Sequence, residues 1–511
     1  MRTFLVPSVG LGVTLFCISS GIAQGAVYYV RSAAAGAANG SDWSNAYQAL
    51  PSSMVRGATY YMASGTYAGY TFSTAENGTN TITVKKATLA DHGTSAGWSD
   101  SYDNGPAVFT NTVQFSKGYF ILDGQTGGGP QSWTNGFGFK IQSLSTTQPR
   151  PGIYVGEGRK NVTLRHFEVQ GNGGDGDGDG SGQANDALSI EVGTDQTTVS
   201  YAYLHDMGRC LIFGHGNNMF FEYIYGGTFE STPVEHSEVA SIWATINAPP
   251  PLCTNVTFAN CVWSHIEGTG GLMMYADGVK IYGNTFYRPA GVTFPVGLGA
   301  IATWYQAWGT GTFAHGRIYN NSFIDLGQGF PVSGISWGST NAIDNVVENN
   351  VFYNCSLNFG GISTHDYNLF INTTGENAAS EAHGASASSA IFNDYHSLNF
   401  TLQSNTVAGT NAGAPYDIDP NGVPRTTGTR GAYEFGSGAA GVLLKPQSTG
   451  TQISLSWPDT GFNFKLYATA SLNPPALWTQ VTNAPVLANG WWSVSPPAPV
   501  ATGQFYRLQG P

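Results

Sequence analysis

The sequence predicts an all-β solenoid followed by a small antiparallel β-domain. The first observation is a phrase repeated four times within residues 254–355, in which apolar residues alternate on both sides of a small turn. Self-similarity of this kind is typical of repeat architectures, and the alternation is that of strands. The second observation is composition: charged residues make up 10%, aromatic residues 13%, and 68 of the 511 residues are glycine. This composition suits turn-dense, secreted all-β proteins and not a helical cytosolic enzyme.

The repeat extends toward the N-terminus when each coil is aligned on its first inward position. These positions are predicted at Val162, Val199, Met219, Val256, Val279, Gly316 and Asn345. The steps between them are 37, 20, 37, 23, 37 and 29 residues. One coil needs about 20 to 29 residues, so the longer steps are predicted to carry inserted loops, where function usually resides.

An asparagine ladder is predicted five positions after the coil start. The last three coils carry Asn284, Asn321 and Asn350 there. Stacked asparagines can hydrogen-bond one another at the ~4.8 Å strand spacing. We interpret this ladder as structural.

The net charge and the N-terminal segment restrict the kinds of partner and the location that we expect for this protein. The net charge of −12 argues against nucleic acid or an anionic membrane surface, and an acidic polymer would need a local basic site or a cation. Met1-Arg2 followed by an apolar run through residue 18 predicts a secretory signal peptide, and no other stretch is long enough for a transmembrane segment. We therefore expect a monomer that is secreted or held at the cell surface. The four remaining cysteines are too few for a disulfide scaffold, and a single disulfide bridge among them is an alternative that we leave open.

The N-terminal part of the predicted solenoid begins with Val27-Tyr-Tyr-Val30, a short helix at 42–50 and a strand within 58–67. Three further short strands are predicted, at 81–86, 107–109 and 119–123.

This opening resembles secreted right-handed parallel β-helix proteins of the pectate-lyase-like superfamily, in which a short N-terminal helix caps the solenoid. The segments Asp417-Ile-Asp-Pro-Asn-Gly-Val-Pro-Arg425 and Arg430-Gly-Ala-Tyr-Glu-Phe435 resemble the C-terminal seal of such proteins. The resemblance covers about residues 27–435 and implies a right-handed parallel β-helix. It does not select a reaction, because the superfamily includes lyases, hydrolases, epimerases and adhesins.

Four regions follow from these patterns: a signal peptide at 1–26, the β-helix at 27–435, a Gly/Ser/Ala linker at 436–441 and a module at 442–511. The last region has five short aromatic-rich strands, which predict a small antiparallel β-sandwich. It resembles a C-terminal β-module common on secreted bacterial proteins. Its aromatic residues favour core packing or surface retention over sugar binding.

The sharpest local motif is Asp175-Gly-Asp-Gly-Asp-Gly180, which continues to Asp186. It has the spacing of a twelve-residue calcium loop, with carboxylates at positions one, three, five and twelve and glycine at position six. The predicted calcium ligands are Asp175, Asp177, Asp179 and Asp186. The motif departs from the usual pattern in Gly182, which replaces the apolar anchor, and it has no flanking helices. A solvated acidic loop is the alternative.

Three strands that enter neighbouring coils are predicted to align charges in one column. The matched apolar residues are Leu188, Leu211 and Ala240, and the aligned charges are Asp186, Arg209 and Glu238. A ladder of mutually neutralising charges is one interpretation. The other is a sugar-binding cleft in which the guanidinium fork of Arg209 faces a uronate carboxylate. Glu191 and Trp243 are predicted to line this cleft, and His236 precedes Glu238.

A second polar column is predicted nine residues after each coil start. Its members are His265, Arg288, Asp325 and Asn354. Solvated turn residues are the simplest interpretation of it, and substrate binding by Arg288 is the functional alternative. His205-Asp206 and His265 are further candidate acid–base groups, because histidine titrates near neutrality. Trp304 is a candidate platform for sugar stacking.

Two reactions fit these residues. β-Elimination on a uronic-acid polymer requires a neutralised carboxylate and a base, with Arg209 as neutraliser, His236 or His265 as base, and Glu238 and Asp186 orienting or binding calcium. Inverting hydrolysis could use Asp186 and Glu238, which are predicted two coils apart at about 9.6 Å. The related chondroitin- and alginate-lyase branch typically has a lysine after this strand. This sequence has Trp243 there, a departure that argues against the mechanism of that branch. The sequence favours elimination on an extracellular polysaccharide, with hydrolysis second and a non-catalytic adhesin as the alternative.

Overall fold

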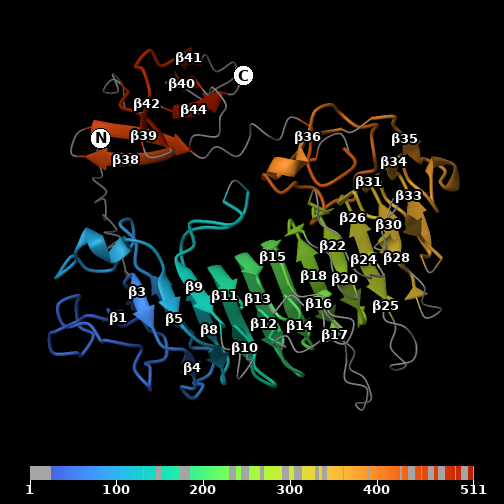
Figure 1. The fold of residues 1–511 in the computed structure, drawn as a ribbon. Helices are drawn as coiled ribbons and strands as arrows, with labels where there is room; N and C mark the ends of the chain where they lie inside the picture. Colours follow the sequence, from blue (N-terminus) through green and yellow to red (C-terminus); the bar gives the residue numbers. More distant parts are fainter. Residues whose placement is uncertain are drawn as a thin grey trace, which may run out of the picture.

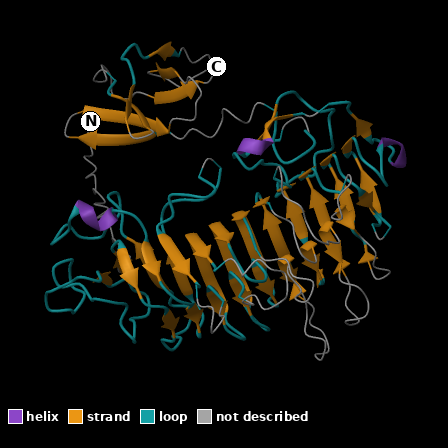
Figure 2. Ribbon diagram, in the orientation of Figure 1, coloured by secondary structure: helices purple, strands orange, loops and turns teal. Residues whose placement is uncertain are grey.

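The computed structural model describes residues 25–130, 132–144, 151–172, 185–229, 238–242, 253–264, 270–289, 299–303, 313–327, 333–336, 342–360, 362–389, 391–425, 429–435, 444–449, 452–458, 465–469, 478–488, 491–496 and 505–509. The predicted all-β solenoid is confirmed. Figures 1 and 2 show strands stacked coil upon coil, with loops at the corners between them.

Three sheets of parallel strands form the solenoid walls. The strands of the largest sheet are β1 (Val27–Val30), β2 (Thr59–Met62), β3 (Gly65–Tyr67), β5 (Ile82–Lys86), β6 (Ala107–Phe109), β8 (Phe120–Asp123), β9 (Phe139–Gln142), β11 (Lys160–Gln170), β13 (Asp195–His205), β15 (Met219–Gly226), β18 (Val256–Ala259), β19 (Val262–Trp263), β22 (Lys280–Tyr282), β23 (Thr285–Tyr287), β26 (Arg317–Tyr319), β27 (Ser322–Ile324), β30 (Val346–Glu348), β31 (Val351–Tyr353), β33 (Thr364–Asp366), β34 (Leu369–Ile371) and β35 (Ala385–Ser386). The predicted strands at 81–86, 107–109 and 119–123 correspond to β5, β6 and β8.

The other two walls are smaller. The strands of the second sheet are β4 (Tyr70–Phe72), β7 (Val113–Phe115), β10 (Ile153–Val155), β12 (Leu188–Ile190), β14 (Ile212–Gly214), β16 (Glu238–Ile242), β20 (Gly270–Met274), β24 (Gly299–Thr303), β28 (Ser333–Ser336) and β32 (Leu357–Asn358). The third sheet comprises β17 (Cys253–Thr254), β21 (Ala276–Asp277), β25 (Phe313–Ala314) and β29 (Ala342–Ile343).

The remaining elements lie outside these walls. They include the antiparallel pair β36 (Phe392–Asp394) and β37 (Asn399–Leu402), and the short 3₁₀ helices η1 (Asp100–Asp103), η3 (Ala378–Ser380) and η4 (Tyr395–Ser397). The C-terminal strands are β38 (Lys445–Thr449), β39 (Gln452–Pro458), β40 (Lys465–Thr469), β41 (Thr479–Gln480), β42 (Val486–Ala488), β43 (Trp491–Val494) and β44 (Phe505–Gln509). They form two antiparallel sheets, as expected of a small β-sandwich. The domain boundaries themselves stay predictions.

The solenoid interior is one continuous apolar core. Aromatic rings stack from coil to coil: Phe286, Phe323 and Phe352 follow one another with ring centroids 4.8 and 4.9 Å apart. Because each coil has too small an interior to bury its apolar face alone, this stacking is what stabilises the fold. The four described cysteines are buried and unbridged, so no disulfide contributes among them.

The predicted asparagine ladder is confirmed. Each amide nitrogen donates to the next amide oxygen at 3.0 Å, from Asn284 to Asn321 and from Asn321 to Asn350. The structure adds a rung at Asn368, which receives the Asn350 amide at 3.0 Å and donates in turn to Glu381 at 2.6 Å. The ladder therefore ends on a carboxylate.

A left-handed residue precedes each rung of this ladder. The residues at this turn have φ between 51° and 67°, and they are His166, Tyr201, Tyr223, Asn260, Gly283, Asn320, Asn349 and Tyr367. A single αL residue reverses the strand pleat, so the next side chain points inward. In the last four coils that side chain is the ladder asparagine.

Two predictions are wrong. Segment 42–50 is not a helix, because the Asp42 carboxylate accepts the Asn45 backbone N–H at 2.8 Å and closes a tight turn instead. The start of the second coil is not Val199: Val162 pairs with Thr197, and Leu164 pairs with Val199. The error is two residues, so Val199 keeps its inward direction.

No helix in the described part of the chain is both long and apolar enough to span a bilayer.

Candidate functional site at a corner of the solenoid

The candidate site lies where the largest sheet ends and the second sheet begins, on the coils of β11 and β13 in the middle of the solenoid (Figure 1). The chain leaves β13 at His205 and reaches β14 at Ile212. In the preceding coil, the chain leaves β11 at Gln170 and reaches β12 at Leu188, and the predicted calcium loop lies between these two strands. This corner therefore brings His205-Asp206, Arg209 and Asp186 to the same pair of coils.

His205 is held between two carboxylates. Its Nδ1 lies 2.8 Å from the Asp206 carboxylate, and its Nε2 lies 3.1 Å from the Glu168 carboxylate. Both ring nitrogens are therefore occupied by carboxylate partners, one from β11 and one directly after β13. The ring of Tyr203 stacks on it with centroids 3.9 Å apart.

Both carboxylates are held in their ionised form. Burial raises the pKa of Glu168, but hydrogen bonds from His205 and from Lys140, whose ammonium lies 2.6 Å away, outweigh it and lower that pKa. Burial likewise raises the pKa of Asp206, and bonds from Thr228 and His205 reverse the shift. The side chain of Asp206 is 40% exposed, so the Asp206 end of this hydrogen-bonded group is in contact with solvent.

Arg209 and Asp186 form a bidentate ion pair. The Nε and one terminal nitrogen of Arg209 donate to the two Asp186 oxygens at 2.9 and 2.5 Å, and the Cys210 backbone N–H also donates to Asp186 at 3.2 Å. Arg209 also lies over the ring of Phe213. Its side chain is 27% exposed, so the guanidinium reaches the surface while the partner carboxylate is buried.

The predicted charge column is wrong by one residue. Leu188 pairs with Ile212, not with Leu211, and Ile212 pairs with Ala240. Cys210 therefore lies between Asp186 and Glu238, and its thiol donates to the Glu238 carboxylate at 3.3 Å. Arg209 lies one position outside the column and reaches Asp186 from there.

Burial changes the role available to the two column carboxylates. Asp186 is 2% exposed and Glu238 is fully buried. An inverting pair must leave room for water and substrate between its carboxyl groups. Asp186 and Glu238 do lie two coils apart, as the sequence predicts. Both side chains are buried, so the space between them is not open to a polymer.

The second predicted column is present in its described members. The Arg288 Nε donates to the Asp325 backbone carbonyl at 3.2 Å, and the Asn354 amide donates to the Asp325 carboxylate at 2.7 Å. The other Asp325 oxygen accepts from the Tyr395 hydroxyl at 3.0 Å. Arg288 therefore lies in a polar ladder several coils away from the corner.

Of the remaining predicted residues, Glu191 accepts a hydrogen bond from the Ser189 hydroxyl at 2.9 Å, on the outer face of β12. The others lie outside the described residues: His236, His265, Trp243, Trp304, Asp175, Asp177 and Asp179. Sequence reasoning missed Lys140, Glu168 and Tyr203. Glu168 and Tyr203 are Cα partners, so the correct register of β11 on β13 was the signal that would have found them.

His215, two residues beyond Phe213, gives this region a pH dependence. Burial, followed by the positive charge of Arg209, lowers the pKa of His215 from 6.5 to about 4. Below pH 6.5 the His215 ring binds a proton in the unfolded chain but not in the folded chain. The free energy of unfolding is therefore highest above pH 6.5 and falls as the pH drops toward 4. We expect up to about 3 kcal/mol of acid destabilisation from this group. Urea unfolding of His215→Gln between pH 7 and 4, measured beside the wild type, should lack that part of the loss.

Part of the solenoid matches a family of known proteins. The family described as "Right handed beta helix region" matches residues 188–416. Among solved structures, a PL6 family polysaccharide lyase from Pseudopedobacter saltans is 12% identical, covers 69% of this chain and 96% of its own, and has a TM-score of 0.31. A tailspike protein of Acinetobacter baumannii bacteriophage Fri1, a capsular polysaccharide depolymerase, is 10% identical, covers 84% and 78%, and has a TM-score of 0.29. XylC in complex with xylose is 9% identical, covers 94% and 100%, and has a TM-score of 0.32. The search of curated proteins finds no match.

Proposed function

We propose that this chain, whose residues 188–416 match the right-handed β-helix family, cleaves an extracellular uronic-acid polysaccharide by β-elimination. The observation that supports the proposal is the His205 ring held between two carboxylates, four residues before the partly exposed Arg209. Secretion to the cell surface or beyond is part of the proposal.

Elimination needs three groups, and the corner offers two of them. Arg209, oriented by Asp186, supplies positive charge to the uronate carboxylate, which acidifies the C5 proton. A base removes that proton, a C4–C5 double bond forms, and the C4–O bond breaks. His205 supplies the proton for the leaving oxygen through Asp206, whose carboxylate is the exposed end of the pair. His236 and His265 remain the proposed bases.

Calcium bound by the loop that starts at Asp175 is part of the proposal, with a limited role. The Asp186 carboxylate accepts both bonds from Arg209, so it does not fit the predicted twelfth-position ligand. Among the described residues, no three His, Cys, Asp or Glu side chains are grouped to hold a metal ion. Asp175, Asp177 and Asp179 would hold the ion, and calcium would supply positive charge toward a uronate. Calorimetric titration of the whole protein with CaCl₂ measures this binding.

The proposal is tested by incubating the protein with pectic, alginate and glycosaminoglycan polymers and following ultraviolet absorbance of the unsaturated product. We expect one of these classes to give absorbance, and His205→Ala to lower the rate at least about 100-fold through loss of the proton donor. His315→Ala is the matched control. The His315 ring also pairs with an aspartate, Asp277, at 2.6 Å, but it is exposed and lies several coils away from the corner site.

Two outcomes contradict elimination. Reducing ends without an unsaturated product would indicate hydrolysis, for which the buried pair of Asp186 and Glu238 is poorly suited. Binding of a polymer without any product, unchanged in His205→Ala, would favour a non-catalytic adhesin that uses the solenoid as a rigid spacer.

A further inference from the structure

The C-terminal module, residues 442–511, has an outer sheet face that is separate from its apolar core. This sheet contains β41, β40 and β44, with β40 in the centre. Trp457 and Leu466 are buried in the core of the module. Because side chains alternate along a strand, Lys465 and Tyr467 on either side of Leu466 point to the outer face. Lys465 is exposed and Tyr467 is half-buried.

The register of the neighbouring strands adds two side chains to this face. Gln480 in β41 is the Cα partner of Tyr467 and is exposed. In β44, Tyr506 packs against the core, so Phe505 beside it points outward, and Phe505 is 43% exposed. Phe505 is the Cα partner of Thr469, two residues beyond Tyr467, so the two aromatic residues are diagonal neighbours outside the core. What we call the module face comprises Lys465, Tyr467, Gln480 and Phe505.

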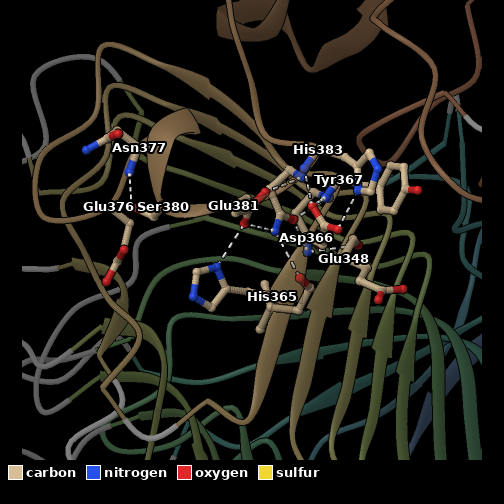
Figure 3. A network of polar contacts seen from close by, with 12 residues as sticks. Glu348, His365, Asp366, Tyr367, Glu376, Asn377, Ser380, Glu381 and His383 are labelled. Carbon is tan, nitrogen blue, oxygen red and sulfur yellow. Dashed lines mark hydrogen bonds and ion pairs between the residues drawn. The ribbon is translucent and has the colours of Figure 1, made fainter.

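The module differs in charge from the rest of the chain. Residues 442–511 contain three basic residues and one acidic residue, a net charge of +2, so residues 1–441 carry a net charge of −14. Figure 3 shows an acidic region near the C-terminal end of the solenoid, in which Glu348, Asp366 and Glu381 lie near one another. An acidic polymer is repelled by a surface of this kind and requires a local basic site.

Many lysine and arginine residues of the solenoid are engaged by its own carboxylates. The described ion pairs are Lys85–Asp91, Lys86–Asp103, Lys140–Glu168, Arg165–Asp123, Arg209–Asp186, Arg317–Asp344 and Arg425–Glu434. Lys465 is exposed, and in the part of the chain that the structure describes no carboxylate lies within ion-pair distance of its ammonium group. The positive charge of Lys465 is therefore available to a ligand, on the same face as Tyr467.

We propose that the module face binds an acidic polysaccharide, the polymer class on which the proposed elimination acts. The rings of Tyr467 and Phe505 pack against the apolar faces of sugar units, since aromatic side chains bury a large apolar area on binding. The Lys465 ammonium pairs with a uronate carboxylate, and the Gln480 amide donates to and accepts from sugar hydroxyl groups. A nucleic acid fits less well, because its binding requires several cations to neutralise successive phosphates and the whole module has three basic residues.

Binding at the module face raises the concentration of polymer near the corner site, because both sites belong to one chain. The inference rests on the proposed function for its class of ligand, but it names other residues and a separate measurement. Polymer that binds at the module face without yielding an unsaturated product contradicts elimination alone. An unsaturated product, with unchanged polymer affinity in variants of the module face, contradicts this inference alone.

The test measures binding of the full chain to polygalacturonate, alginate and hyaluronan by isothermal titration calorimetry, in a His205→Ala background that leaves the polymer intact. We expect one of these polymers to bind, and its affinity to fall about 10-fold in Tyr467→Ala and in Phe505→Ala. Lys465→Ala should weaken binding about 3- to 5-fold and make the affinity less sensitive to NaCl, because one charge contact is lost. In the active chain the same variants should raise KM on the polymer by these factors and leave kcat unchanged.

Two control variants remove similar side chains from other surfaces. Lys280→Ala removes an exposed lysine from β22 of the solenoid, and Val486→Ala removes an exposed apolar side chain from β42, in the other sheet of the module. Both should bind like the parent chain. The melting temperature of each variant separates loss of the module fold from loss of a ligand contact.

The inference is overturned if the chain binds none of the acidic polymers, or if Tyr467→Ala, Phe505→Ala and Lys465→Ala bind like the parent. It is also overturned if neutral dextran or single-stranded DNA binds as tightly as the acidic polysaccharide, because the face then does not select a uronate polymer. Affinity losses that occur only together with a lowered melting temperature, and not in Lys465→Ala, contradict it as well.

Discussion

Replacing Asn350 by alanine is expected to lower the free energy of unfolding by about 3 to 5 kcal/mol, since several buried polar groups lose their partners at once. Its amide nitrogen donates to the Ile318 carbonyl, the Glu348 carbonyl and the Asn368 side chain at 2.9 to 3.0 Å. Its amide oxygen accepts the backbone and side-chain N–H of Asn321 at 2.9 and 3.0 Å. Urea unfolding followed by tryptophan fluorescence measures the change.

Asn354→Ala is the control for this prediction. Asn354 belongs to an outward ladder, where it donates to Asp325 and accepts from Asn372 near solvent. Water replaces those bonds, so its loss is expected to cost no more than about 1 kcal/mol. Equal effects of the two variants would mean that the inward ladder does not stabilise the solenoid.

Arg209→Ala is expected to cost about 2 kcal/mol of folding free energy, separate from any effect on activity. Breaking a buried ion pair typically costs about 3–5 kcal/mol, and the partial exposure of Arg209 reduces this. The buried Asp186 carboxylate loses two charge-assisted hydrogen bonds. The change is measured by urea unfolding at pH 7.

The matched control is Arg317→Ala, in which Arg317 no longer donates to the backbone carbonyl and the exposed carboxylate of Asp344. It is expected to cost less than about 1 kcal/mol, because water replaces the lost contact. Asp186→Asn should lower stability as Arg209→Ala does, and the double variant should cost less than the sum of the two. Additive losses would show that the two side chains do not stabilise each other.

The regular part of the chain could be predicted from the sequence, because each coil repeats the same inward positions. The asparagine ladder follows from this spacing. Its end could not be predicted, because Glu381 reaches Asn368 from 13 residues further along the chain, outside the repeated phrase. The start of the second coil was misplaced because a fully buried threonine, Thr197, occupies a position where an apolar residue was expected.

The candidate site was less predictable for a related reason. In Cys210-Leu-Ile-Phe213 the residues Leu211 and Ile212 are both fully buried, so alternation does not reveal which of them continues the inward column. That ambiguity moved Arg209 into the wrong row. The contacts of Lys140 and His205 with Glu168 span 28 and 37 residues of sequence, and only the register of the strands brings them together.

The central claim is that the corner site performs elimination on a uronic-acid polymer. The most direct measurement is ultraviolet absorbance of the full-length protein incubated with pectic, alginate and glycosaminoglycan polymers, with reducing ends measured in the same samples. We predict that one polymer class gives an unsaturated product and that the absorbance is lost in His205→Ala but kept in His315→Ala. Reducing ends without absorbance, or absorbance unchanged in His205→Ala, would contradict the claim.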